Sequence, residues 1–172
     1  RKKSKISSKD IASKISSLTD FKYKEFDDNE LSKLIQKFNK RIDRYVNFSI
    51  ETIPDVKKSN KLNKEQQKEK EGKLIISKIS STDRLFLFDE NGELFNSIEF
   101  SNFFQKQMNS GVKQIIFVVG GAYGFSQEIY KKANSRISLS KMTFSHQMVR
   151  LIAVEQIYRA FTILKNEPYH HR

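Results

Sequence analysis

Three glycines in the segment 118–124 are the first residues whose types and spacing suggest chemistry. The segment reads Val-Val-Gly-Gly-Ala-Tyr-Gly and closes an apolar run, 114–119, that predicts a buried strand. Glycine lets a ligand approach the backbone, and ligands of open α/β sheets bind at the carboxyl ends of strands. A phosphate-binding P-loop would continue with Gly-Lys-Ser/Thr, and a dinucleotide fingerprint would come early in a βαβ unit. Neither pattern fits, so a ligand-binding turn and a tight turn without a ligand both remain open.

The elements that must position this turn alternate between helices and strands. Apolar periodicity predicts helices over 27–45, 63–79 and 98–108, and strands over 48–53, 85–88 and 114–119. Asn63 and Ser97 are the expected helix caps, and 89–92 is an expected turn. Gly72 inside a helix costs about 1 kcal/mol relative to alanine, which indicates close packing there. This order is typical of an α/β fold with a mainly parallel sheet flanked by helices.

The last third of the chain predicts a loop over 137–144 and a long helix that Ser145 caps and that ends near Leu164. This helix is apolar nearly all round, so it is either a central core helix or half of a subunit interface. Glu155 and Arg159 stand four residues apart and can form an ion pair on it.

The composition sets outer bounds on the function. The 172 residues suit a single domain over 1–172, in which residues 1–19 are atypical and predict at most a short strand over 14–19. A net charge of +12 and a pI near 9.8 favour a polyanionic partner, although a lysine-rich genome gives the same bias. The chain has no cysteine, which excludes disulfides and thiolate chemistry. No apolar run approaches the roughly 20 residues of a membrane span, and we expect a cytoplasmic protein.

Several motifs occur together in one order. They are Lys68-Glu69-Lys70-Glu71-Gly72, Phe88-Asp89-Glu90, Gly120-Gly121, 139–144 (Leu-Ser-Lys-Met-Thr-Phe), 146–150 (His-Gln-Met-Val-Arg), 155–160 (Glu-Gln-Ile-Tyr-Arg-Ala) and 167–170 (Glu-Pro-Tyr-His). This set closely resembles the RlmH family of SPOUT-class methyltransferases over about residues 20–172. Two features differ: residues 1–19 lack the apolar first strand of that family, and Ala122 stands where the family often has proline.

The resemblance implies a C-terminal trefoil knot (an α/β knot) with S-adenosylmethionine bound in it, and no metal. The residues expected around the cofactor are Phe88, Gly120, Leu139, Ser140, Lys141, Met142, Thr143 and Phe144. It also implies a homodimer that methylates N3 of a pseudouridine in 23S ribosomal RNA of the large subunit, on the assembled ribosome. The alternative from another class is a non-catalytic RNA-binding or ribosome-binding protein that keeps the fold.

Methylation at N3 requires that this nitrogen lose its proton, and a nearby cation or hydrogen-bond donor stabilises the resulting anion. The candidates that the resemblance offers are His146, Arg150, Tyr169 and His170. Each has a structural alternative. His146 can belong to the helix start, Arg150 can form a structural pair or bind phosphate, and residues at the end of a chain are usually poorly ordered.

Overall fold

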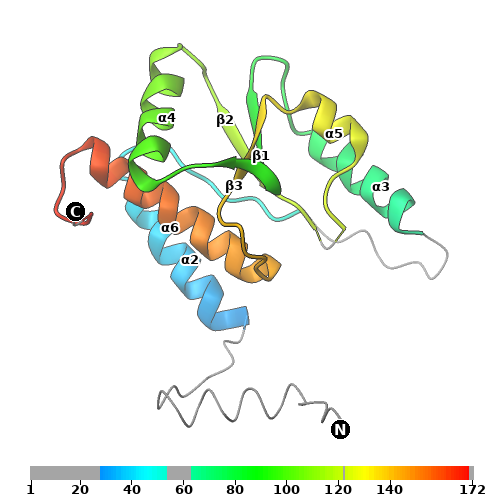
Figure 1. The fold of residues 1–172 in the computed structure, drawn as a ribbon, viewed down its shortest axis with the longest axis horizontal. Coiled ribbons are helices and arrows are strands. Elements are labelled where there is room, and N and C mark those ends of the chain that lie inside the picture. Colours follow the sequence, from blue (N-terminus) through cyan, green and yellow to red (C-terminus); the bar gives the residue numbers. More distant parts are fainter. Residues whose placement is uncertain (1–27, 54–62, 122, 171–172) are drawn as a thin grey trace, which may run out of the picture.

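A three-stranded parallel sheet lies at the centre of the computed structural model, which describes residues 28–53, 63–121 and 123–170. Its strands are β1 (Arg84–Leu94), β2 (Ile115–Val119) and β3 (Ser135–Ser138), in the order β2-β1-β3. Helices α2 (Asp28–Ile42), α4 (Ser97–Asn109) and α6 (His146–Leu164) cover one face, and α3 (Lys64–Ile76) and α5 (Gln127–Lys132) cover the other (Figure 1). The predicted α/β fold with a parallel sheet flanked by helices is confirmed.

The central strand β1 explains why both faces are covered. Successive side chains of a strand point to opposite faces, and the run Leu85–Phe88 is apolar at every position. Leu85 and Leu87 pack with α3 and α5, whereas Phe86 and Phe88 pack with α2, α4 and α6. All four side chains are buried, which is the pattern of a strand at the centre of a parallel sheet.

The two connections between the strands run in opposite directions across the sheet. It runs from β1 through α4 to β2, and then returns through α5 to β3 on the other side of β1. Because crossovers between parallel strands are right-handed, reversing the direction places the second helix on the opposite face. Because the three strands are parallel, the segments that follow them all emerge at the same edge of the sheet, the carboxyl edge.

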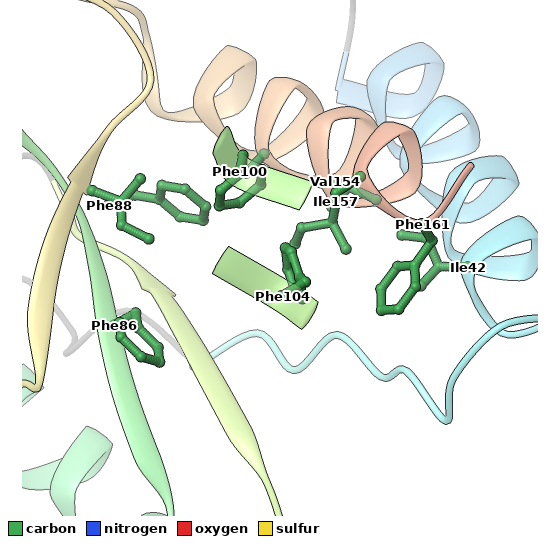
Figure 2. Close-up of a cluster of buried hydrophobic side chains, with 11 residues drawn as sticks. Ile42, Phe86, Phe88, Phe100, Phe104, Val154, Ile157 and Phe161 are labelled. Carbon is green, nitrogen blue, oxygen red and sulfur yellow. The ribbon is translucent and has the colours of Figure 1, made fainter. Parts of the chain in front are cut away.

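Aromatic side chains fill the larger core, on the α2, α4 and α6 face. Figure 2 shows Phe100 and Phe104 of α4 between the sheet residues Phe86 and Phe88 and the helix residue Phe161. The rings of Phe104 and Phe161 lie 5.2 Å apart, and those of Phe100 and Phe104 meet edge to face at 5.1 Å. This packing fixes α6, so one side of the nearly all-apolar helix belongs to the core of the chain.

The smaller core depends on the glycine that the sequence singled out. Gly72 is buried in α3, and a Cβ there would lie 3.2 Å from Ser126 Cβ and 3.4 Å from Ile129 Cγ1 of α5. The expectation that close packing requires glycine at this position is confirmed. α3 and α5 can thus lie side by side on the sheet (Figure 1).

The predicted strand over 48–53 is wrong, because these residues have no regular secondary structure. Phe48 packs on the larger core, and Glu51 forms an ion pair with Lys78. An alternating sequence becomes a strand only where a neighbouring strand supplies hydrogen bonds, and the described part of the sheet gives it none.

Other element boundaries also differ from the sequence prediction. Asn96 rather than Ser97 caps α4, with its side chain accepting hydrogen bonds from the N–H groups of Ile98 and Glu99. The expected turn over 89–92 lies within β1, where the pairing with β3 is irregular and a Cβ on Gly92 would come within 2.6 Å of the Ile137 backbone. β3 and α5 were not predicted, since both are short and polar. The short strand considered over 14–19 lies outside the described residues.

Candidate functional site

Three predicted cofactor segments meet where β2 and β3 end beside the middle of β1. Phe88 pairs in register with Val119 of β2 on one side and with Ile137 of β3 on the other. Gly120 directly follows β2, and Leu139 directly follows β3. Segments that are far apart in the sequence therefore meet at one edge of the sheet, where α/β proteins bind ligands.

Phe88 contributes mainly to the core. Its side chain is only 7% exposed, and its ring stacks on Phe117 with centroids 5.6 Å apart and planes 21° apart. Its contribution to a ligand contact is therefore limited to the small edge that remains exposed.

The glycine turn is closed and tightly packed. The N–H of Gly124 donates to the carbonyl of Gly121 at 3.0 Å, and Gly124 has a φ of +74°, which favours glycine. A Cβ on Gly120 would lie 3.0–3.3 Å from the Phe125 ring, and one on Gly121 would lie 3.0 Å from Glu71 Oε2. Packing inside the chain therefore accounts for part of the glycine requirement.

The loop over 139–144 is anchored at its base and open beyond it. Leu139 packs on the larger core, the Ser138 hydroxyl donates to the Ser140 carbonyl at 2.9 Å, and the Met142 N–H donates to Ser140 Oγ at 2.9 Å. Lys141, Met142 and Thr143 are exposed, and Met142 is 73% exposed. The loop thus presents backbone groups and an uncovered apolar side chain beside the carboxyl edge.

His146 and Arg150 lie on the first turns of α6, directly after this loop. Ser145 caps the helix by accepting a hydrogen bond from the Met148 N–H, which confirms the predicted cap. His146 and Arg150 are both exposed, and residues four apart share one face of a helix. No acidic residue occupies the first turn of α6, so the helix dipole and Arg150 make this end electropositive.

Tyr169 is held at a different place. Its hydroxyl donates to Glu155 Oε1 at 3.1 Å, and Arg159 Nη2 donates to the same oxygen at 2.6 Å, so the predicted pair of Glu155 and Arg159 is confirmed. The Arg159 guanidinium lies 4.8 Å from the centroid of the Tyr169 ring. Burial, and then the Glu155 carboxylate, raise the pKa of Tyr169 above its ordinary value. Tyr169 is thus fixed against α6, and His170, which follows, is half-buried.

One chain does not bring all four candidate catalytic residues together. Glu155, which holds Tyr169, lies nine positions beyond His146, or roughly 14 Å along the helix axis. His146 and Arg150 therefore belong to the carboxyl edge, whereas Tyr169 and His170 belong to the opposite half of α6.

The surroundings of Tyr169 were not predictable from the sequence. A hollow of about 610 Å³ is lined by Arg41, Arg44, Tyr45, Tyr158, Glu167 and Tyr169. The Arg41 guanidinium lies over the rings of Phe38 and Tyr158, and the Tyr45 hydroxyl donates to Glu167. Nothing in the spacing of the basic residues of α2 indicates their aromatic partners on α6, so the sequence carried no signal for this hollow.

A second hollow, of about 470 Å³, contains none of the predicted residues. It is lined by Gln127, Tyr130, Ala133, Ser135 and Arg136 of α5, β3 and the turn between them. Beside it, the Tyr130 hydroxyl donates to Asp89 Oδ2 at 2.6 Å. Burial, followed by this hydrogen bond, raises the pKa of Tyr130 to about 12. The phenol is therefore neutral and the pair is structural, so we place the candidate site at the carboxyl edge instead.

Two findings bear on a membrane or metal role. No helix in the described ranges is long and apolar enough to cross a membrane. The same residues include no group of three or more histidine, aspartate or glutamate side chains arranged to hold a metal ion.

Comparison with known proteins defines the class. Residues 21–170 match the family model described as "Predicted SPOUT methyltransferase", so the chain belongs to the SPOUT methyltransferase family. It is 59% identical over 146 residues to ribosomal RNA large subunit methyltransferase H of Flavobacterium johnsoniae, which covers 85% of this chain and 93% of the relative. The protein of the same name from Christiangramia forsetii gives the same values, and that of Porphyromonas gingivalis is 47% identical over 145 residues, 84% of this chain and 92% of the relative. Within the SPOUT methyltransferases, the chain thus groups with the RlmH proteins that its motifs resemble.

Proposed function

We propose that this chain is an S-adenosylmethionine-dependent methyltransferase that methylates N3 of a pseudouridine in 23S ribosomal RNA of the large subunit. The observation that carries the proposal is the convergence of Phe88, Gly120 and the loop 139–144 at the carboxyl edge of the sheet. The relatives named above are methyltransferases of ribosomal RNA of the large subunit, which supports the same substrate. We further propose one domain with the knot of the family in its C-terminal part, working in the cytoplasm on assembled ribosomes.

The residues at the carboxyl edge fit S-adenosylmethionine. Gly120 carries no side chain and is half-exposed, the loop 139–144 offers backbone groups that can read the edge of an adenine, and Met142 offers an uncovered apolar surface. When bound, this cofactor supplies a methyl group already activated on a sulfonium, so the chemistry requires no metal. The task of the protein is to hold the donor and the target nitrogen close and in line, an effect worth about 7–11 kcal/mol.

His146 and Arg150 suit the other requirement, which is stabilisation of the anion formed when N3 loses its proton. Both are exposed on the electropositive end of α6, directly after the loop 139–144. A cation or donor preorganised beside the developing charge lowers the barrier, because it needs no rearrangement during the reaction. Lys141 on the loop adds positive charge on the same side.

A homodimer would bring in Tyr169 and His170. In one chain these residues lie roughly 14 Å along α6 from His146, so they can meet it only across a subunit boundary. Leu151 and Ile152 of α6 are only half-buried and Met142 is exposed, which leaves apolar surface for a second copy. Because its pKa is raised, Tyr169 remains protonated and would act as a hydrogen-bond donor rather than as a base.

The charge of the protein suits a ribosomal substrate. The net charge is +12, and the outer side of α2 exposes Lys33, Lys37 and Lys40. Contacts between basic side chains and phosphates supply much of the affinity for RNA and weaken as salt is added. The ribosome itself would supply a further part of the recognition.

The first experiment is calorimetry of S-adenosylmethionine binding to the purified protein and to Gly120→Val. We expect saturable binding by the wild type and none by the variant. Because a Cβ at this position also meets the Phe125 ring, Gly120→Val is compared with the double variant Gly120→Val/Phe125→Leu, whose smaller side chain relieves that contact. Binding that returns in the double variant would attribute the loss to internal packing, and would count against Gly120 as part of the cofactor site.

Met142→Ala is the matched variant on the loop. Since Met142 is 73% exposed, its truncation should leave the thermal unfolding midpoint unchanged while weakening cofactor binding. Equal affinity for wild type and Met142→Ala would remove this side chain from the site.

The second experiment measures transfer of labelled methyl groups to ribosomes that lack the modification, with the methylated base located by mass spectrometry. A methyl group on N3 of a pseudouridine in 23S RNA supports the proposal. Methylation of another base would correct the substrate. Cofactor-independent ribosome binding without any transfer would favour the alternative, a non-catalytic ribosome-binding protein.

A further inference from the structure

Tyr123 is an exposed aromatic side chain on the rim of the candidate site, and local structure does not account for it. It lies in the turn closed between Gly121 and Gly124, and its side chain is 44% exposed. The core therefore gains little from this ring. Tyr123 is three residues beyond Gly120, which keeps it within roughly 11 Å of that glycine even for a fully extended chain.

Lys64 lies against this ring from another element. Its ammonium nitrogen is 5.5 Å from the centroid of the Tyr123 ring, and Lys64 is the first residue of α3. A positive charge at the start of a helix opposes the helix dipole, so Lys64 does not favour α3 electrostatically. Both the Tyr123 ring and the Lys64 side chain are exposed. Their two segments also meet at a second point, where Gly121 faces Glu71.

The combination of an open aromatic face and a neighbouring ammonium fits one kind of ligand well. Unpaired RNA bases stack on aromatic side chains, while lysine neutralises the adjoining phosphate. A small anion would need only the charge, and an apolar ligand would need only the ring. The net charge of +12 also favours a polyanion at an exposed site.

We propose that Tyr123 and Lys64 bind a nucleotide that flanks the methylated one, with the base stacked on Tyr123 and its phosphate beside Lys64. This inference rests on the proposed function for the location of the target nucleotide. Tyr123 and Lys64 act as positioning residues, which hold the RNA at the carboxyl edge while other groups carry the chemistry.

The test is methyl transfer to ribosomes lacking the modification, with KM, kcat and cofactor Kd measured for Tyr123→Leu and Tyr123→Phe. Stacking is worth about 1–3 kcal/mol per base, so Tyr123→Leu should raise the KM for ribosomes roughly 5- to 140-fold. The cofactor Kd should be unchanged, and Tyr123→Phe should keep a KM near that of the wild type because it keeps the ring. Met108→Ala is the control, since Met108 is also 44% exposed but lies on α4.

Lys64→Gln provides the second arm, with Lys70→Gln on another side of α3 as its control. Lys64→Gln removes one phosphate contact, so the slope of log Kd against log salt concentration should fall by about one unit. Lys70→Gln should leave this slope unchanged. A ribosome KM that Tyr123→Leu leaves unchanged would overturn the inference, as would a parallel loss of cofactor binding.

Direct binding of large-subunit RNA separates this inference from the proposed function. If the wild type binds RNA in a Tyr123-dependent way but transfers no methyl group, the nucleotide site is supported and the proposed function fails. If the wild type methylates ribosomes and none of the Tyr123 or Lys64 variants alters the KM or the salt dependence, the proposed function holds and the nucleotide site is refuted.

Discussion

Replacing Gly72 by alanine tests how the two helices on the smaller core are held together. Alanine is favoured over glycine in a helix by about 1 kcal/mol, so α3 alone would become more stable. In the folded protein, however, the new methyl group would overlap the Ser126 side chain, with Ser126 Cβ only 3.2 Å away. Overpacking of this kind costs about 1–3 kcal/mol. Ser126 also caps α5 by accepting a hydrogen bond from the Ile129 N–H, and loss of a cap costs about 1 kcal/mol.

The unfavourable terms exceed the gain in helix propensity, so Gly72→Ala should destabilise the protein by about 2 kcal/mol. For a protein of this size the midpoint of thermal unfolding would fall by roughly 4–8 °C, which circular dichroism measures directly. The matched background is Ser126→Gly, which removes both close atoms and costs the cap only a few tenths of a kcal/mol. In this background the atom nearest to the new Cβ is Ile129 Cγ1 at 3.4 Å, which is an ordinary contact. Gly72→Ala should therefore raise the free energy of unfolding by about 1 kcal/mol. The reasoning is refuted if Gly72→Ala stabilises the wild type, or if its effect has the same sign in both backgrounds.

Three further predictions concern the larger core and the two part-buried tyrosine hydrogen bonds. Phe104→Ala leaves a cavity among packed rings and should lower the free energy of unfolding by about 3–5 kcal/mol in urea denaturation; a loss below 1 kcal/mol would contradict the aromatic core. The pKa of Tyr130 is raised to about 12, so its hydrogen bond to Asp89 should stabilise the fold below pH 10 and cease to do so as the pH rises through 12. The urea midpoint of Tyr130→Phe should therefore lie below that of the wild type at pH 8, with the difference disappearing near pH 12; a difference that grows with pH would reverse the sign of this argument. Glu155→Ala removes the acceptor of the Tyr169 hydroxyl, so amide hydrogen exchange at the end of the chain should accelerate while the sheet is unaffected; unchanged exchange there would show that other contacts hold the tail.

Sequence patterns predicted the elements whose stability is local or whose burial is complete. The run Leu85–Phe88 is apolar at every position, and such a run is a strand only if both faces are covered, which the fold confirms. The long helix after Ser145 was equally clear, since a cap and an apolar surface on all sides leave few alternatives. By contrast, the alternating pattern of 48–53 is also typical of a strand, but this segment has no partner strand in the described sheet.

The candidate site divides in the same way. The glycine turn and the loop 139–144 were visible in the sequence, and the parallel order of the strands predicts that their ends share an edge. The four candidate catalytic residues were not separable by sequence, because their grouping depends on where Glu155 holds Tyr169 along α6. The contact between Lys64 and Tyr123 was equally invisible, since it joins two elements that meet only after α3 packs on the turn.

The sequence by itself determined the class of this protein: a basic α/β chain with the ordered motifs of a SPOUT methyltransferase. Composition and residue spacing predict the α/β architecture, because periodicity and capping act between neighbours along the chain, whereas the methyltransferase class comes from the resemblance of the motifs to the RlmH family. Only the tertiary structure decided that Phe88 serves the core, that Gly72 lets α3 lie close to Ser126 and α5, and that Tyr169 lies far from His146 within one chain. These facts depend on the distances between segments remote in sequence, and such distances are set by how side chains fill the space between the sheet and its helices.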